Sequence, residues 1–412
     1  MQSMKQITYS SNIDTKIDVI PSKSIILRVL TAIYLSGEKS KIINRSGCED
    51  EKSALRLLRD LGVRIETDGY IQFEEFTKNI KRNINFGESG FLTRTFSLIL
   101  VARDMGFKVE GTGSLKKRRF DDLLKVLRKL DVNVKSFNSK LPFKISGPLI
   151  KKNISIDCSN TSQILSGLLL LLPSLEGDSL VEVKNLVSKP YIDLTLDVLG
   201  KFGVEIKNEN YDRFFIKGAQ KFRKVNYKVE GDWSNAAYWA VLGALKGRIV
   251  LKNLNVDSKQ GDKIILNILK KAGADISIKK KKVTVEKNRL NSFDFDATDY
   301  PDLVPVLTVL GLNCKGTSKI SGINRLINKE SNRLKSILKE FEKLGADLEV
   351  QKDTLIVKGS RLNPGKVKSH NDHRIAMALA VAGKNIKGGI KLDSWMSVNK
   401  SYPGFFDILE SV

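Results

Sequence analysis

Both histidines of this chain, His370 and His373, lie in one polar segment, residues 369–374. Histidine changes its charge near neutral pH, and the guanidinium of the neighbouring Arg374 is shaped to bind a carboxylate through two hydrogen bonds. A lone histidine is usually structural, but two in one polar segment beside an arginine favour proton transfer next to a bound carboxylate. His373 and Arg374 are therefore candidate site residues.

A second candidate group surrounds Glu330, which follows Lys329 and precedes Arg333 by three residues. Its carboxylate has the chemistry of a general acid, although adjacent cations favour its charged form. The alternative is an ordinary surface ion pair between residues i and i+3 of a helix. Asp302 follows Pro301 where another helix is expected to start, so it is either a general base or part of a proline-led helix cap.

Six segments rich in Gly, Ser, Thr, Asn or Asp each precede an apolar stretch with helical character. Such segments cap helices and leave backbone N–H groups that can bind phosphate or carboxylate. Any one of them could be a plain cap, but six in comparable positions, several followed by Lys or Arg, indicate an anionic ligand. The segments are residues 21–24, 87–90, 159–163, 231–234, 298–302 and 371–372.

An internal repeat of about 70 residues must position these candidates. Five times, an amphipathic helical pattern runs into a turn residue, where a helix end favours left-handed backbone, and then into a short strand. Residues 405–409 predict a sixth helix without a following strand, and the alternating residues 6–20 are expected to supply that strand. The five turn residues are Gly62, Asp131, Gly203, Gly273 and Gly345.

Six such repeats predict two domains of three repeats each. The first is expected to comprise residues 21–228, and the second residues 1–20 together with 229–412. The chain then crosses twice between the domains, and we expect the active site in the cleft between them.

Composition narrows the function classes. The longest apolar stretch, residues 164–172, is shorter than the roughly 20 residues that a bilayer requires, and the N-terminus lacks the apolar core of a signal peptide, so we expect a cytoplasmic protein with no membrane partner. Three cysteines, each more than a hundred residues from the next, predict neither a disulfide framework nor a metal site. The formal charge of +24 favours anionic partners. Because no basic groove interleaved with aromatic residues is visible, phosphorylated metabolites fit better than nucleic acid.

Taken in order, the motifs resemble the 5-enolpyruvylshikimate-3-phosphate synthase family essentially from end to end. Residues 22–24 resemble its Ser-Lys-Ser opening, and residues 87–90 its Gly-Asn-Ala-Gly loop. The most specific matches are Lys-Glu-Ser at 329–331 with Arg333, and Asn-Asp-His-Arg at 371–374. The resemblance implies an α/β, two-domain enolpyruvyl transferase fold, an inside-out α/β barrel of six βαβαββ-type repeats with three per domain. It also implies a monomer that uses no metal or other cofactor.

The implied reaction transfers the enolpyruvyl group of phosphoenolpyruvate to the 5-hydroxyl of shikimate 3-phosphate and releases phosphate, through a tetrahedral addition-elimination intermediate. The resemblance gives Asp302 the role of hydroxyl base, Glu330 that of acid and His373 that of proton relay, and it adds Lys23 to the catalytic set. The residues implied to bind shikimate 3-phosphate are Lys23, Ser24, Arg28, Thr161, Ser162, Gln163, Ser188, Tyr191, Asp302 and Lys329. Those implied to bind phosphoenolpyruvate are Lys23, Gly90, Arg118, Gln163, Arg333, Arg374 and Lys400.

The chain departs from the family pattern at several positions. Glu88 stands where the family has Asn, Ser114 aligns with an Arg, and Arg325 aligns with an Asn. We expect Arg118 to supply the cation that Ser114 does not. Three alternatives stay open: a UDP-N-acetylglucosamine enolpyruvyl transferase, a basic nucleic-acid-binding protein, and a relative that has lost activity.

Overall fold

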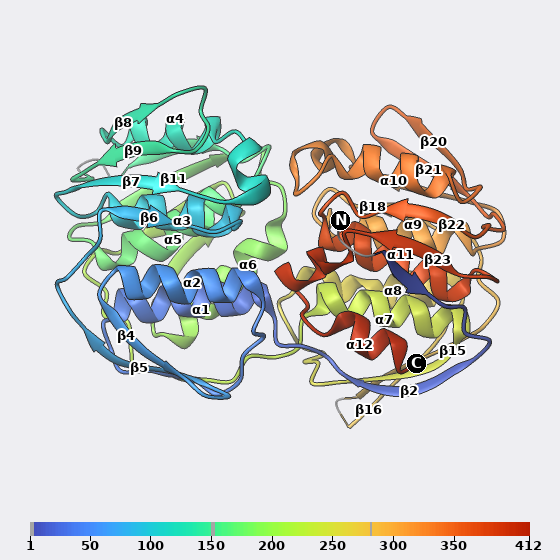
Figure 1. The fold of residues 1–412 in the computed structure, drawn as a ribbon. Coiled ribbons are helices and arrows are strands. Elements are labelled where there is room, and N and C mark those ends of the chain that lie inside the picture. Colours follow the sequence, from blue (N-terminus) through green and yellow to red (C-terminus); the bar gives the residue numbers. More distant parts are fainter. Residues whose placement is uncertain (1–3, 150–152, 281) are drawn as a thin grey trace. The chain divides into compact units, whose positions relative to one another are not determined.

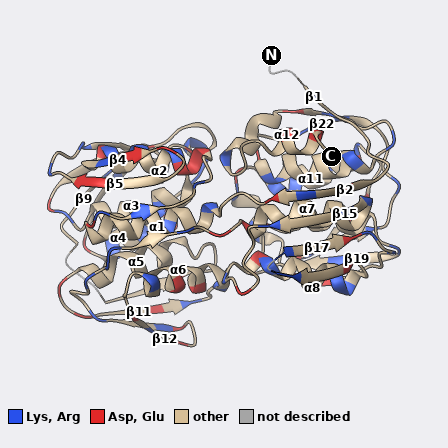
Figure 2. Ribbon diagram, turned by 90° about the horizontal axis from the view of Figure 1, so that it is seen from below, with Lys and Arg blue, Asp and Glu red and all other residues tan. Residues whose placement is uncertain are grey.

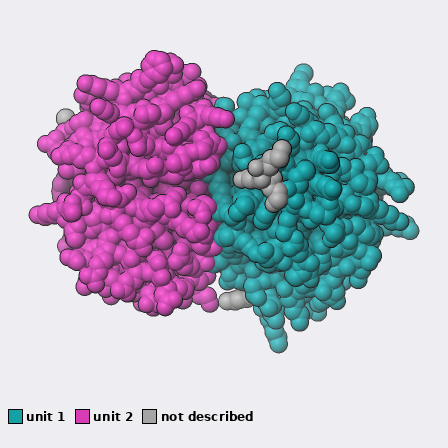
Figure 3. Space-filling model, in the orientation of Figure 1, with its two compact units in different colours: residues 1–22, 230–412 teal, residues 23–229 magenta. Residues whose placement is uncertain are grey.

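The computed structural model describes residues 4–149, 153–280 and 282–412. Two compact units divide the chain (Figure 3): unit 1 is Met1–Ser22 with Glu230–Val412, and unit 2 is Lys23–Val229. Residues 1–3, which belong to the second domain expected from the sequence, lie outside the described residues. Lys and Arg are distributed over both units and interspersed with Asp and Glu (Figure 2).

Unit 2 contains three four-stranded mixed sheets (Figure 1). In each sheet the first two strands are parallel and the other neighbours antiparallel. In spatial order the sheets are β14 (Asn226–Tyr227), β3 (Lys41–Ile42), β5 (Ile71–Phe76), β4 (Val63–Thr67); then β6 (Asn83–Asn85), β7 (Gly106–Glu110), β9 (Phe143–Ser146), β8 (Asn133–Ser136); and β10 (Ile154–Asp157), β11 (Ser179–Lys184), β13 (Arg213–Ile216), β12 (Ile206–Glu209).

Unit 1 repeats this pattern, with three strands instead of four in its last sheet. Its first two strands in each sheet are again parallel. The sheets are β2 (Ile13–Asp18), β15 (Gly247–Lys252), β17 (Lys282–Glu286), β16 (Asp275–Lys279); then β18 (Asp294–Asp296), β19 (Thr317–Ser321), β21 (Thr354–Lys358), β20 (Asp347–Gln351); and β22 (Gly365–Lys368), β23 (Ile390–Asp393), β1 (Lys5–Ile7).

The start of the chain completes two sheets of unit 1. β1 pairs antiparallel with β23, with Lys5 opposite Leu392, which confirms that the N-terminus supplies the strand missing after the last helix. The alternating segment 6–20 is not one strand, because β2 separates from β1 and pairs with β15 in another sheet. Burial alternates along β2, so one of its faces packs on the core while the other is exposed.

Three helices in each unit are apolar on nearly every side and lie in the core. All nine residues of α9 (Val304–Leu312) are buried, as expected of a helix without a polar face. The other inner helices are α1 (Lys23–Ser36), α3 (Gly90–Leu100), α5 (Gln163–Leu171), α7 (Trp233–Lys246) and α11 (His373–Asn385). In unit 2, α5 packs against both α1 and α3, and in unit 1, α7, α9 and α11 pack against one another.

Six further helices are the amphipathic ones that the repeat predicts. All five predicted turn residues have left-handed backbone, with φ from +61° at Asp131 to +102° at Gly273, which confirms the turns. At Gly62 packing adds a second reason for glycine, because a Cβ would lie 2.6 Å from the carbonyl oxygen of Thr77. These helices are α2 (Glu49–Asp60), α4 (Asp121–Lys129), α6 (Lys189–Lys201), α8 (Ile265–Ala272), α10 (Arg333–Glu342) and α12 (Phe405–Glu410).

Among the residues that the structure describes, each unit therefore repeats strand, helix, strand, helix and a strand pair three times, with one strand fewer in the last repeat of unit 1. Among the described residues, no helix is both long enough and apolar enough to cross a membrane.

Candidate active site

The six capping segments noted in the sequence lie at the N-termini of the six inner helices. Ser89 accepts a hydrogen bond from the Leu92 N–H at the start of α3. Asp232 does the same for the Asn235 N–H in α7, and Asp372 for the Arg374 N–H in α11. The N-terminus of a helix carries partial positive charge, so these positions favour anionic ligands.

In unit 2, two arginines and one amide gather at the start of α3. Arg94 donates from Nη1 to Gln163 Oε1 at 2.9 Å and to the Gly90 carbonyl oxygen at 3.2 Å. A Cβ on residue 90 would lie 2.9 Å from Arg94 Nη1 and 3.1 Å from Arg118 Nη1. The structure thus brings the predicted residues Gly90, Arg118 and Gln163 together, and Arg94, which follows the same motif, lies with them.

Lys23, the first residue of α1, has an acidic neighbour that the sequence did not indicate. Its Nζ lies 3.4 Å from Oδ2 of Asp50, and the two side chains are 15% and 7% exposed. Asp50 is one of three consecutive acidic residues at the start of α2, a pattern that suggests only favourable charge at a helix N-terminus.

Arg28 lies deep in unit 2 and is bonded on several sides. It donates to Thr195 Oγ1 at 2.8 Å and to the carbonyl oxygens of Ser24 at 2.9 Å and Tyr191 at 3.1 Å. Burial lowers the pKa of Arg28 to about 10, which leaves it a cation at neutral pH. The predicted residues Ser24, Arg28 and Tyr191 therefore lie together. Thr195 was missed, because nothing in the sequence connects it with a residue in α1.

Three more predicted residues of unit 2 lie at helix starts. Thr161 accepts a hydrogen bond from the Gln163 N–H at 3.2 Å. Ser162 precedes α5 and is buried. Ser188 is buried before α6 with a left-handed φ of +58°.

In unit 1, the guanidinium of Arg333 joins three carboxylates. Nη1 donates to Asp302 at 2.7 Å, Nη2 to Glu330 at 2.7 Å and Nε to Asp372 at 2.8 Å. The Arg333 side chain is only 2% exposed, so the alternative that Glu330 and Arg333 form an ordinary surface ion pair is wrong. Asp372 was not among the predicted site residues, although it stands beside His373 in the segment that holds both histidines.

Asp302 does not cap α9; the residue at the cap position is Leu303. A second oxygen of Asp302 lies 3.5 Å from Nη2 of Arg374. Burial would raise the pKa of Asp302, but Arg374, Arg333 and Lys329 outweigh it and hold this pKa well below its usual range. Burial also lowers the pKa of Lys329 to about 8.

The guanidinium of Arg374 has hydrogen-bond donors that the described part of the protein does not use. Its Nε and Nη1 are buried and have no hydrogen-bond partner among the described residues. Buried donors are normally satisfied, so two on one guanidinium indicate a place for a ligand carboxylate or phosphate. The Tyr238 hydroxyl donates to the Arg374 carbonyl at 3.2 Å and fixes the backbone there. Tyr238 lies in the apolar run of α7, where the sequence indicates only core.

Two further predicted residues of unit 1 are His373 and Lys400. The His373 ring is 2% exposed, with Nδ1 3.8 Å from Asp372 Oδ1. Lys400 ends the short 3₁₀ helix η5 (Trp395–Lys400) and is half-buried. Within the described ranges, no group of three or more His, Cys, Asp or Glu side chains is arranged to hold a metal ion.

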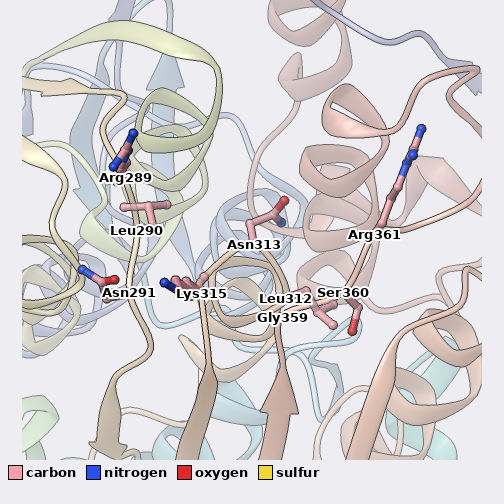
Figure 4. A pocket seen from close by; sticks show the side chains of 10 residues that line it. Arg289, Leu290, Asn291, Leu312, Asn313, Lys315, Gly359, Ser360 and Arg361 are labelled. Atoms are coloured by element: carbon pink, nitrogen blue, oxygen red, sulfur yellow. The ribbon is translucent and has the colours of Figure 1, made fainter.

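A cavity of about 700 Å³ lies elsewhere in unit 1 (Figure 4). Residues 312–315, which begin at the last residue of α9, line it, together with Arg289 and Arg361. Asp302 precedes the opposite end of α9. No predicted site residue lines this cavity.

Comparison with known proteins gives consistent matches over the whole length. A family model described as EPSP synthase (3-phosphoshikimate 1-carboxyvinyltransferase) matches residues 7–409. The 3-phosphoshikimate 1-carboxyvinyltransferase of Clostridium novyi is 37% identical, over 98% of this chain and 96% of the relative. That of Clostridium acetobutylicum is 38% identical, over 96% of this chain and 94% of the relative.

Two solved structures share the fold. The EPSP synthase from Acinetobacter baumannii has a TM-score of 0.84 at 24% identity, covering 98% of this chain and 97% of that one. The enolpyruvyl transferase NikO from Streptomyces tendae has a TM-score of 0.80 at 15% identity, covering 99% and 97%.

Proposed function

This chain belongs to the EPSP synthase family, and on that premise we propose that it transfers the enolpyruvyl group of phosphoenolpyruvate to the 5-hydroxyl of shikimate 3-phosphate. The relatives named above are 3-phosphoshikimate 1-carboxyvinyltransferases, so neither a UDP-N-acetylglucosamine enolpyruvyl transferase nor a nucleic-acid-binding protein is favoured. A monomer located in the cytoplasm is part of the same proposal.

The observation that carries the proposal is the group formed by Arg333, its carboxylate partners and Arg374. Two of these carboxylates, Asp302 and Glu330, are bonded to the same guanidinium. Enolpyruvyl transfer requires one group that accepts a proton and one that gives a proton, both close to cations that hold the donor's carboxylate and phosphate. This arrangement contains all three kinds of group.

In the addition step, the 5-hydroxyl oxygen bonds to C2 of phosphoenolpyruvate. The hydroxyl proton passes to Asp302, and the proton of Glu330 passes to the C3 methylene, which becomes a methyl group. In the elimination step, the methyl group returns a proton to the Glu330 carboxylate, the C2–O bond to phosphate breaks, and phosphate leaves with the electron pair and takes up the proton held by Asp302. The products are the enolpyruvyl ether and phosphate.

Without substrate, Arg333 and Arg374 favour the charged form of Asp302, and a carboxylate with a lowered pKa is a weak base. Phosphoenolpyruvate bound to these arginines would add negative charge next to Asp302 and Glu330. That charge would raise the proton affinity of both carboxylates, so that Glu330 can hold the proton it gives and Asp302 can accept one from the hydroxyl. Binding of the donor would therefore prepare the acid and the base.

The proposal also includes cations and hydroxyls outside the carboxylate group. We propose that Lys23, Ser24, Arg28, Thr161, Ser162, Gln163, Ser188 and Tyr191 bind shikimate 3-phosphate together with Asp302 and Lys329. Phosphoenolpyruvate would be bound by Lys23, Gly90, Arg94, Arg118, Gln163, Arg333, Arg374 and Lys400.

Product analysis tests this proposal. Incubation with shikimate 3-phosphate and 13C-labelled phosphoenolpyruvate should give an enolpyruvyl ether at the 5-oxygen, identified by NMR. An unchanged mixture, or a labelled enolpyruvyl group attached to another oxygen, would refute the proposal.

A further inference from the structure

Two departures from the family pattern, Glu88 and Ser114, are in direct contact. The Ser114 hydroxyl donates to Oε2 of Glu88 at 2.8 Å. Glu88 lies one residue before the cap of α3, and Ser114 lies in the short 3₁₀ helix η1 (Gly113–Lys117). Both side chains are half-buried. The bond therefore ties the start of η1 to the start of α3.

The surrounding chain is shaped for this contact. Gly113 has a φ of +51°, and a Cβ there would overlap the Glu88 carboxylate. The Thr112 N–H donates to the Gly87 carbonyl at 2.8 Å, beside the side-chain bond. Leu115 is fully buried and anchors the middle of η1. A side chain at position 113 would therefore displace the Glu88 carboxylate from its present place.

Arg118 follows η1 directly, and its N–H donates to the Leu115 carbonyl at 3.2 Å. Its Nη1 and that of Arg94 both approach Gly90 closely. Because Arg118 is attached to the end of η1, the place of its guanidinium depends on how firmly the start of η1 is held.

We propose that Glu88 is a positioning residue that acts through Ser114 and η1 to hold Arg118 where it meets phosphoenolpyruvate. This inference rests on the proposed function, which assigns Arg118 to that substrate. It opposes a simpler interpretation, in which an anion at position 88 only repels the substrate's phosphate and weakens binding. The two interpretations predict opposite effects on binding. In the first, Glu88 strengthens the binding of phosphoenolpyruvate, and in the second it weakens that binding.

Steady-state kinetics of four variants separates the two interpretations. Glu88→Gln keeps an oxygen that accepts from Ser114 and should leave the KM for phosphoenolpyruvate within about twofold of the unmodified protein. Glu88→Ala removes the acceptor and should raise that KM about fivefold or more, with kcat and the KM for shikimate 3-phosphate nearly unchanged. Ser114→Ala should also raise the KM for phosphoenolpyruvate. Glu66→Ala, an exposed glutamate in β4, is the matched control and should have no effect.

The decisive comparison is the double variant Glu88→Ala with Arg118→Ala. If Glu88 acts through Arg118, the double variant should have the same KM for phosphoenolpyruvate as Arg118→Ala alone. Multiplied effects in the double variant would overturn the inference. So would a lower KM in both Glu88→Gln and Glu88→Ala, which is the result that simple repulsion predicts.

Hydrogen exchange distinguishes failure of this inference from failure of the proposed function. Glu88→Ala should speed amide exchange in a peptide covering residues 111–118, and Glu88→Gln should restore it, whether or not the protein turns over phosphoenolpyruvate. Unchanged exchange in Glu88→Ala would overturn the positioning role even in an active enzyme. An inactive unmodified protein with the expected exchange pattern would refute the proposed function and, with it, the assignment of Arg118 to phosphoenolpyruvate.

Discussion

Arg333 Nη1 donates to Asp302 Oδ1 at 2.7 Å, between a buried guanidinium and a carboxylate that is 22% exposed. Part of the Asp302 side chain is exposed, whereas the Arg333 side chain is enclosed by the protein. The cation therefore acts on Asp302 from the protein side. In the proposed reaction, an anion bound beside Asp302 would raise the pKa of this carboxyl toward its usual range.

Replacement of Glu330 by Gln tests the proton donor. The amide preserves volume and a hydrogen-bond acceptor for Arg333 but cannot deliver a proton to carbon, so kcat should fall by about a hundredfold or more. Substrate affinities measured by calorimetry should change much less. Glu342→Gln, an exposed acid at the end of the following helix α10, is the control. Turnover near that of the unmodified protein in Glu330→Gln would remove this residue from catalysis.

Replacement of Arg333 by Ala tests the stabilising role of the same cluster. Asp302, Glu330 and Asp372 would lose a shared cation in a largely buried place. Breaking a buried ion pair from one side typically costs about 3 to 5 kcal/mol, which urea unfolding would register as a lower midpoint. The exposed Arg361→Ala should change the midpoint little. Equal midpoints for both variants would show that the cluster does not stabilise unit 1.

The pH dependence of shikimate 3-phosphate binding tests Lys329. Because burial lowers the pKa of Lys329 to about 8, its ammonium is charged below that pH and loses its charge as pH rises above it. Affinity for the anionic substrate should therefore fall above pH 8, and binding there should take up a proton. Calorimetry in buffers of different ionisation enthalpy measures that proton. Lys329→Met should remove the uptake; the same uptake in this variant would assign it to another group.

Arg374→Lys tests the donors that Arg374 leaves unused. Lysine keeps the positive charge but cannot offer two parallel N–H groups to a carboxylate. The KM for phosphoenolpyruvate should rise about tenfold or more, while that for shikimate 3-phosphate changes little. If both constants change equally, Arg374 is not specific for the donor substrate.

The local part of this molecule could be predicted from the sequence. The left-handed turns at Gly62 and Asp131 follow from a helical pattern that ends at a residue tolerant of positive φ, a signal contained in about ten residues. The capping segments were visible for the same reason. The strand supplied by the N-terminus followed from counting repeats.

Partners distant in sequence could not be predicted. Arg333 bonds Glu330 three residues away, which the sequence suggested, but also Asp302 and Asp372, which are 31 and 39 residues away. Arg28 and Thr195 are 167 residues apart. Glu88 and Ser114 were each noticed as departures, yet only the packing of η1 against the start of α3 shows that they form one contact. Such pairs are set by how the repeats pack, and a single sequence does not record that.

Phosphate release is the most direct test of the proposed activity. Purified protein should release phosphate from phosphoenolpyruvate only when shikimate 3-phosphate is also present. The rate of release should be lower by about a hundredfold or more in Glu330→Gln. Phosphate release that does not depend on shikimate 3-phosphate, release that depends on UDP-N-acetylglucosamine instead, or no release with both substrates present would contradict the account.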